Sequence, residues 1–192
     1  MNFRFTALLG FLVCLASQVP ASAGNNASEV FVRAQKAVFD QASFRATTDA
    51  LLDGKHETVI VEYLKPDRIH EKIGTHMEII VVGKNSFMRG EGGAWKRSPV
   101  FANIAQEAKK TIAGQALLEG AVITPLGSEN LNGTPTMTYR VSYKDNGIES
   151  ITKYWIGTSD NLPRRAESTA KNIKYSTATF EYNINLKINP PI

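Results

Sequence analysis

Along most of the chain, apolar and polar residues alternate with a period of two, which is typical of strands that have one buried and one exposed face. The clearest example runs from Ala178 to Ile188, where apolar residues alternate with Thr, Glu, Asn and Lys. The same alternation recurs from Phe44 to Leu52, from Val59 to Tyr63 and from Met137 to Tyr143. Each of these segments is predicted to be a strand.

Short runs of turn-forming residues separate the predicted strands. No helical spacer of about 10–15 residues, which parallel pairing requires, lies between the strands after Ala121. The strands are therefore expected to pair antiparallel in an up-and-down order. Lys65-Pro66-Asp67 interrupts one apolar run, and Arg68 to Lys72 is expected to continue it as a long, bent strand. The other turns are expected at Asp53-Gly54, Gly83-Lys84-Asn85, Gly127-Ser128, Asn132-Gly133, Asp145-Asn146-Gly147, Asp160-Asn161 and Lys171-Asn172.

Two segments have the period of a helix instead. Ser28 can cap a helix that runs to about Phe39, with apolar residues on one face. Ser98-Pro99 is a favourable helix start, and the amphipathic stripe after it weakens at Gly114. The predicted fold class is α+β: a curved antiparallel sheet, or incomplete open β-barrel, covered by about two helices that act as a lid.

The first residues have the pattern of a secretory signal. Arg4 is followed by an apolar core from Ala7 to Ala16 and by the small residues Ala21-Ser22-Ala23. The expected domain organisation is a signal peptide over residues 1–23, cleaved near Ala23, and one domain over residues 24–192. The apolar run is shorter than the roughly 20 residues that span a bilayer.

Composition excludes several kinds of protein. Cys14 is the only cysteine and lies in the expected signal, so disulfides and thiolate metal sites are not expected. The net charge of +4 is too small to indicate nucleic-acid binding. His56, His70 and His76 lack the spacing of metal ligands, and no Gly-x-Ser-x-Gly motif is present. We therefore expect neither catalytic residues nor a bound metal or cofactor.

Strand and turn order resembles that of the periplasmic lipoprotein-carrier (LolA-like) superfamily. The resemblance rests on Tyr63–Arg68, Glu78–Gly83 and Trp95, and again on Tyr154–Gly157 and Leu162–Arg165. It implies an open barrel whose mouth is covered by helices and whose apolar cavity accepts acyl chains. The dedicated carriers latch the lid with an arginine, and Arg45, Arg68 and Arg140 are left as equal candidates for that role.

This resemblance implies a periplasmic, monomeric protein that binds a lipid or a lipoprotein acyl chain without catalysis. Envelope membrane proteins are possible further partners. The alternative is an envelope protein-interaction or sensor domain of the same fold without lipid cargo. For each candidate cavity residue, ordinary core packing is the competing interpretation. The candidates are Val81, Phe87, Trp95, Phe101, Ile104, Ile112, Tyr139, Val141, Phe180 and Tyr182.

Overall fold

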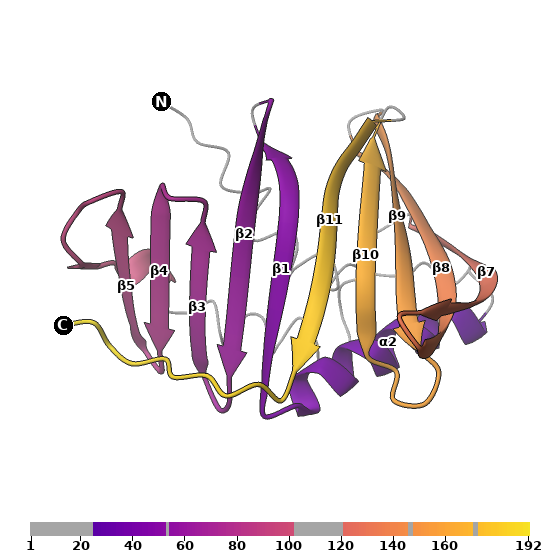
Figure 1. The fold of residues 1–192 in the computed structure, drawn as a ribbon, viewed down its shortest axis with the longest axis horizontal. Coiled ribbons are helices and arrows are strands. Elements are labelled where there is room, and N and C mark those ends of the chain that lie inside the picture. Colours follow the sequence, from indigo (N-terminus) through magenta and orange to yellow (C-terminus); the bar gives the residue numbers. More distant parts are fainter. Residues whose placement is uncertain (1–24, 53, 102–120, 146–147, 171–172) are drawn as a thin grey trace.

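The structure, a computed structural model, describes residues 25–52, 54–101, 121–145, 148–170 and 173–192. These residues form one curved antiparallel sheet of eleven strands, with a helix packed against one face (Figure 1). The helix is α2 (Asn25–Asp40). The strands are β1 (Ser43–Leu52), β2 (Lys55–Leu64), β3 (Arg68–Ile73), β4 (Met77–Val82), β5 (Asn85–Gly90), β6 (Lys96–Arg97), β7 (Val122–Leu131), β8 (Thr134–Asp145), β9 (Ile148–Gly157), β10 (Pro163–Ala170) and β11 (Ile173–Tyr182).

Two meanders, each made of consecutive strands, build the sheet. The first runs from β1 to β6 and the second from β7 to β11, and they join where β1 pairs with β11. Asn132 and Gly133 both adopt positive φ angles in the tight turn between β7 and β8, which is the chemistry expected of an Asn-Gly hairpin. The predicted up-and-down antiparallel order is confirmed for the described strands.

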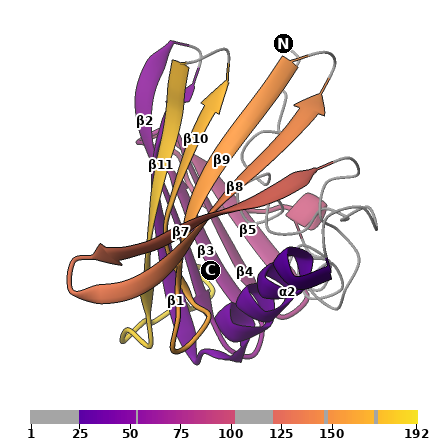
Figure 2. The ribbon, with the colours of Figure 1, turned by 90° about the vertical axis from the view of Figure 1, so that its right-hand side faces the viewer.

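α2 defines an inner face of the sheet, and the sheet curves around it (Figure 2). Phe31 and Ala34, in the first half of the helix, pack on β7–β11 together with Tyr139, Tyr154 and others. Val38, in the second half, packs instead with residues of the first meander. The spacing of these three residues places them on one side of the helix, which explains why the sequence showed an apolar stripe there. One helix therefore bridges both halves of the sheet.

Two predictions about turns are wrong. The segment Arg68–Lys72 does not continue a bent strand, because the chain reverses at Pro66-Asp67 and β3 pairs antiparallel with β2. Gly127 is not in a turn between strands. It lies within β7, where the register shifts between Pro125 and Gly127, and its φ of 120° suits a bulge that only glycine adopts easily.

Strand β11 ends earlier than its alternation predicted. The strand stops at Tyr182, and Asn183, with a φ of 54°, turns the chain out of the ladder. Residues 183–192 then run along the ends of β1 to β4 (Figure 1). The Ser43 hydroxyl donates to the Ile184 carbonyl at 2.6 Å, and Arg68 Nη1 donates to the Ile188 carbonyl at 2.7 Å. The tail therefore alternates apolar and polar residues because one of its sides packs against the sheet, although it pairs with no strand.

The first helix begins at Asn25, three residues before the expected Ser28 cap, and ends at Asp40. After Ser98 the described chain forms only the short 3₁₀ helix η2 (Pro99–Phe101). The predicted second helix beyond it, like the predicted signal over residues 1–23, lies outside the described residues. The open, curved antiparallel sheet with a helix on one face agrees with the predicted α+β class, while a lid of two helices is not shown.

Candidate functional site

The inner face of the first meander is almost continuously apolar. Register places Phe44, Tyr63, Ile69 and Val81 side by side in one row across β1 to β4. The next row on the same face carries Ala46, Val61, Glu71, Ile79 and Met88. Apart from Glu71, these side chains have no charge, so the face offers a surface suited to apolar material.

Six of the predicted cavity residues belong to the two apolar clusters on this side of the sheet. Val81, Phe101 and Tyr182 belong to the cluster on the first meander. Tyr139, Val141 and Phe180 belong to the cluster on the second meander. Tyr139 meets the edge of Phe31 with ring centroids 5.7 Å apart, so α2 occupies the space above it. The six residues are therefore divided between two clusters.

The other four predicted cavity residues do not belong to the two inner-face clusters of the described residues. Phe87 pairs with Ile80 in the register, whereas Val81 pairs with Ser86, so Phe87 lies on the opposite side of the sheet from Val81. Its ring is buried beneath Arg97, whose Cζ lies 5.9 Å from the ring centroid. Trp95 is half-buried against the Arg89 guanidinium. Ile104 and Ile112 lie outside the described residues.

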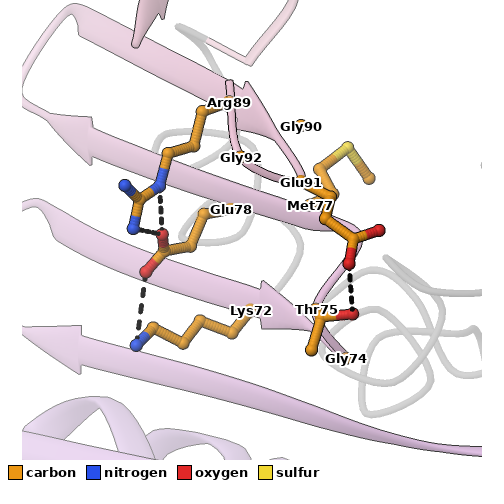
Figure 3. Close-up of a pocket in the computed structure, with 9 residues that line it drawn as sticks. All are labelled: Lys72, Gly74, Thr75, Met77, Glu78, Arg89, Gly90, Glu91 and Gly92. Carbon is orange, nitrogen blue, oxygen red and sulfur yellow. Dashed lines mark hydrogen bonds and ion pairs between the residues drawn. The ribbon is translucent and has the colours of Figure 1, made fainter. Parts of the chain in front are cut away.

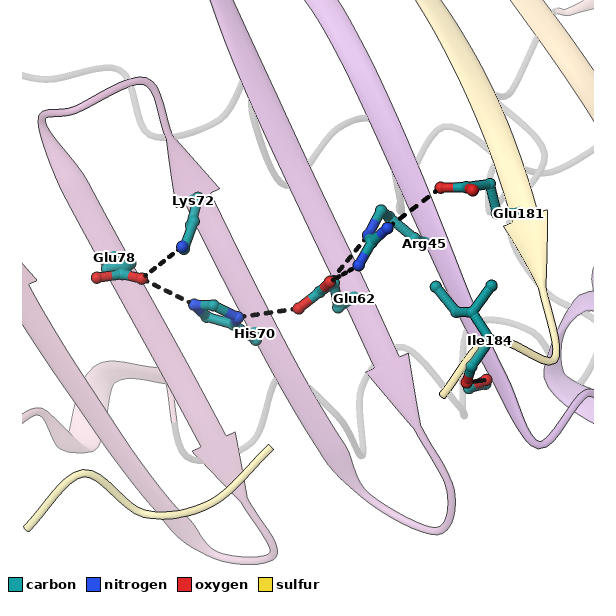
Figure 4. Close-up of polar contacts among 8 residues, drawn as sticks. Arg45, Glu62, His70, Lys72, Glu78, Glu181 and Ile184 are labelled. Carbon is teal, nitrogen blue, oxygen red and sulfur yellow. Dashed lines mark hydrogen bonds and ion pairs between the residues drawn. The ribbon is translucent and has the colours of Figure 1, made fainter. Parts of the chain in front are cut away.

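On the outer face, a ladder of alternating charges crosses β11, β1, β2, β3 and β4 (Figure 4). Arg45 bridges Glu181 and Glu62, and its Nη2 lies 2.7 Å from Glu62 Oε1. The two ring nitrogens of His70 lie 3.0 Å from Glu62 and 3.0 Å from Glu78. Sequence reasoning treated His70 as a solvated residue and missed this ladder. The signal was hidden by the bent-strand prediction, which placed Glu62 and His70 along one strand, whereas β2 and β3 pair and set the two residues side by side.

The ladder shifts the titration of its two central carboxyl groups. Partial burial of Glu62 would raise its pKa, but hydrogen bonds from Arg45 and His70 outweigh burial and hold the pKa below the ordinary value. Burial would likewise raise the pKa of Glu78, but hydrogen bonds from Arg89, His70 and Lys72 outweigh it, and the pKa of Glu78 is also lowered. A carboxyl group with a lowered folded pKa stabilises the fold above its unfolded pKa and loses that contribution on acidification.

Replacing Glu62 and Glu78 together by glutamine is therefore expected to flatten the acid limb of the stability profile. In the parent protein, the stabilisation is complete above the ordinary pKa of 4.5 and falls as the pH drops through the lowered folded values. Urea unfolding at a series of pH values between about 7 and about 3 measures the difference. Glu149→Gln, at a half-exposed site, is the control, and a double variant with the parent's acid profile would contradict the assignment.

A hollow of about 300 Å³ lies where the β3–β4 turn approaches the β5–β6 connection (Figure 3). Its charged side chains already pair with one another. Glu78 lies 3.2 Å from Lys72 and also contacts Arg89, while Thr75 donates to Glu91. This polar rim does not suit an acyl chain. The full lining is Lys72, Gly74, Thr75, Met77, Glu78, Arg89, Gly90, Glu91 and Gly92.

The three candidate latch arginines all make contacts away from the inner face. Arg45 belongs to the outer ladder, and Arg68 binds the C-terminal tail. Arg140 pairs with Lys153 in the register, next to the inner-facing pair of Tyr139 and Tyr154, and therefore also points outward. Within the described part of the chain, none of the three faces α2.

Sequence reasoning treated Glu71 as a solvated residue, but it lies on the inner face of the sheet. Its signal was the alternation itself, because Ile69, Glu71 and Ile73 share one side of β3 while Arg68, His70 and Lys72 share the other. Glu71 is only 8% exposed, and burial raises its pKa to about 7. A group that titrates near neutral pH on an apolar surface is a feature more often found at functional sites than elsewhere.

Within the described ranges, no three His, Cys, Asp or Glu side chains are placed to hold a metal ion. No helix in the same ranges is long and apolar enough to cross a membrane.

No protein-family model and no curated protein matches the chain. Solved structures do share its fold. Lipoprotein LppX of Mycobacterium tuberculosis matches with a TM-score of 0.55 at 13% identity, over 84% of this chain and 97% of LppX. LprF from Mycobacterium bovis matches with a TM-score of 0.58 at 13% identity, over 88% of this chain and 98% of LprF.

An open antiparallel sheet curved around a helix is the fold that the sequence resemblance to the lipoprotein-carrier (LolA-like) superfamily implied, and the chain shares its fold with LppX and LprF. Both mycobacterial proteins are matched over nearly their whole length, so the likeness covers the complete domain. At 13% identity it establishes the fold alone.

Proposed function

We propose that the protein is a periplasmic carrier that holds a lipid, or the acyl chain of a lipoprotein, against the inner face of its sheet. The observation that carries the proposal is the contiguous apolar surface formed by Phe44, Tyr63, Ile69, Val81 and their neighbours on the inner face. Each methylene moved from water onto such a surface contributes about 0.8 kcal/mol, so one acyl chain gives substantial binding. No bond is made or broken in this function.

The lid in this proposal is the amphipathic segment that follows Ser98. Its first turn is described, and there Phe101 enters the apolar cluster with Val81 and is 5% exposed. The neighbouring Val100 points outward and is 79% exposed. Phe101 is thus the point where the predicted lid is anchored to the inner face, and it gives the proposal a residue to test.

The first experiment is native mass spectrometry of the mature protein isolated from its own periplasm, followed by organic extraction and lipid identification. A stoichiometric acylated species is expected, because each methylene of a bound chain that leaves water for an apolar environment adds to its affinity. Protein that is ligand-free and takes up no lipid when challenged would contradict the proposal and favour the interaction-domain alternative.

A pair of adjacent substitutions refines the same experiment. Phe101→Glu is expected to reduce lipid retention, because it places a charge within the apolar cluster at the start of the lid. Val100→Glu adds the same charge one residue away at an exposed position and is the matched control. Circular dichroism shows whether both variants are folded. Equal lipid retention by the two folded variants would contradict the lid assignment.

A further inference from the structure

Glu71 lies at the centre of an apolar surface. In the register it stands between Val61 on β2 and Ile79 on β4, and Ile69 and Ile73 are its same-face neighbours along β3. Val61, Ile69 and Ile79 all belong to the apolar cluster of the first meander. A carboxyl group in such surroundings is costly, because burial removes water from a group that is charged in its ordinary state.

No residue in the described part of the chain offsets the cost of burying this carboxyl group. Glu71 is more than nine-tenths buried. Burial alone accounts for the shift of its pKa, with no hydrogen bond or charged partner among the described residues contributing. Other acidic residues of the same meander are partnered. Glu57, further along the inner face, lies 3.1 Å from His76, and Glu62 is held by Arg45 and His70 on the outer face. Burial raises the pKa of Glu71, as expected for a carboxyl group that has lost water without gaining a partner.

The small hydroxyl side chains on the inner face differ from Glu71 because they carry no charge, and among them only the buried Ser176 hydroxyl is without a partner in the described part of the chain. Thr152 and Ser168 are buried on neighbouring strands of the second meander and satisfy one another through a hydroxyl contact of 3.0 Å. Small hydroxyl groups of this kind are tolerated in a core at little cost once they are paired. An unpaired carboxyl group has no such packing role, so its place on this face points to a ligand.

We propose that Glu71 is the polar anchor of the lipid site, and that it selects amphiphiles whose polar end carries an N–H or O–H donor, such as an amine or a hydroxyl group, over amphiphiles with an acidic head. This inference rests on the proposed function. A donor satisfies the carboxylate, and a cationic amine adds charge attraction in surroundings of low dielectric constant. A carboxylate or phosphate head is repelled by the same charge.

Three amphiphiles with the same saturated chain provide the test: dodecylamine, dodecanol and dodecanoate. Binding of each to the delipidated full-length mature protein is measured by calorimetry at about pH 8, above the pKa of about 7, where Glu71 is ionised. The parent protein is expected to bind the amine and the alcohol at least about tenfold more tightly than the acid, as expected for a charge-assisted hydrogen bond.

Glu71→Gln and Glu71→Leu are expected to lose this discrimination while still binding the chain. Glu149→Gln, on the outer side, is expected to keep the parent's ranking. Equal affinity of the parent for all three amphiphiles, or an unchanged ranking in both Glu71 variants, would overturn the role of Glu71 and leave the carrier function standing. Failure of the parent to bind any of the three would overturn the carrier function, and this inference with it.

Discussion

Replacing Phe31 by alanine is expected to lower the free energy of unfolding by about 3–5 kcal/mol, the range for removing a fully buried aromatic ring. Phe31 is 1% exposed and meets Tyr139 and Tyr154 edge-on, with ring centroids 5.7 Å and 5.2 Å apart. It is therefore the main contact of the first half of α2 with the second meander. Loss of the ring leaves a void that the rigid sheet cannot close.

Denaturant unfolding of the purified mature protein measures this loss. Val32 is the matched control on the same helix, since its side chain is 46% exposed and Val32→Ala is expected to change stability by less than about 0.5 kcal/mol. A similar small effect for both variants would mean that α2 does not hold the two meanders together.

The second large effect concerns the buried carboxyl group. Glu71→Gln is expected to become more stable relative to the parent as the pH rises. Burial raises the pKa of Glu71 from 4.5 to about 7, so between these values the folded parent binds more protons than the unfolded chain does. The parent must therefore lose stability as the pH increases through this window, and the loss is complete above about pH 7.

The size of this loss follows from the two pKa values and amounts to up to about 3 kcal/mol. Since glutamine does not titrate, unfolding free energies of parent and variant measured at about pH 4 and about pH 8 give the difference directly. Glu71→Gln also serves the binding experiments, because a variant that is at least as stable as the parent at high pH cannot lose ligand discrimination by unfolding. Parallel pH profiles for parent and variant would show that Glu71 is not buried in solution.

Strand positions were predictable because alternation and turn chemistry are local. Phe44 to Leu52 reads as a strand in the sequence and is β1, and Asn132-Gly133 marks a turn by its need for positive φ angles. Prediction failed where one local sequence pattern is compatible with two different structures. Lys65-Pro66-Asp67 is compatible with a bend or a reversal, and only pairing of β3 with β2 decides between them. Beyond Tyr182 the alternation is real, but it reflects a tail packed on the sheet.

The candidate site was harder to predict, because a face of the sheet is defined by partners far away in the sequence. Val81 and Phe87 are both apolar and both buried, yet register places them on opposite sides. The importance of Glu71 likewise depends on Val61 and Ile79 flanking it, which only the pairing of three strands reveals. Sequence reasoning counted charged residues as solvated by default, and that rule fails at Glu71.

The pairing of β1 with β11 has a consequence for how the sheet is assembled. Among the described residues β1 is the first strand and β11 the last, and they form the seam between the two meanders. A chain that emerges with its N-terminus first can build β1 to β6 early, but one edge of β1 then has unsatisfied backbone groups until the final strand arrives. Until then this edge can pair with the strand of another chain. Because β11 lies between β1 and β10, loss of the last strand would remove the backbone pairing that joins the two meanders into one sheet.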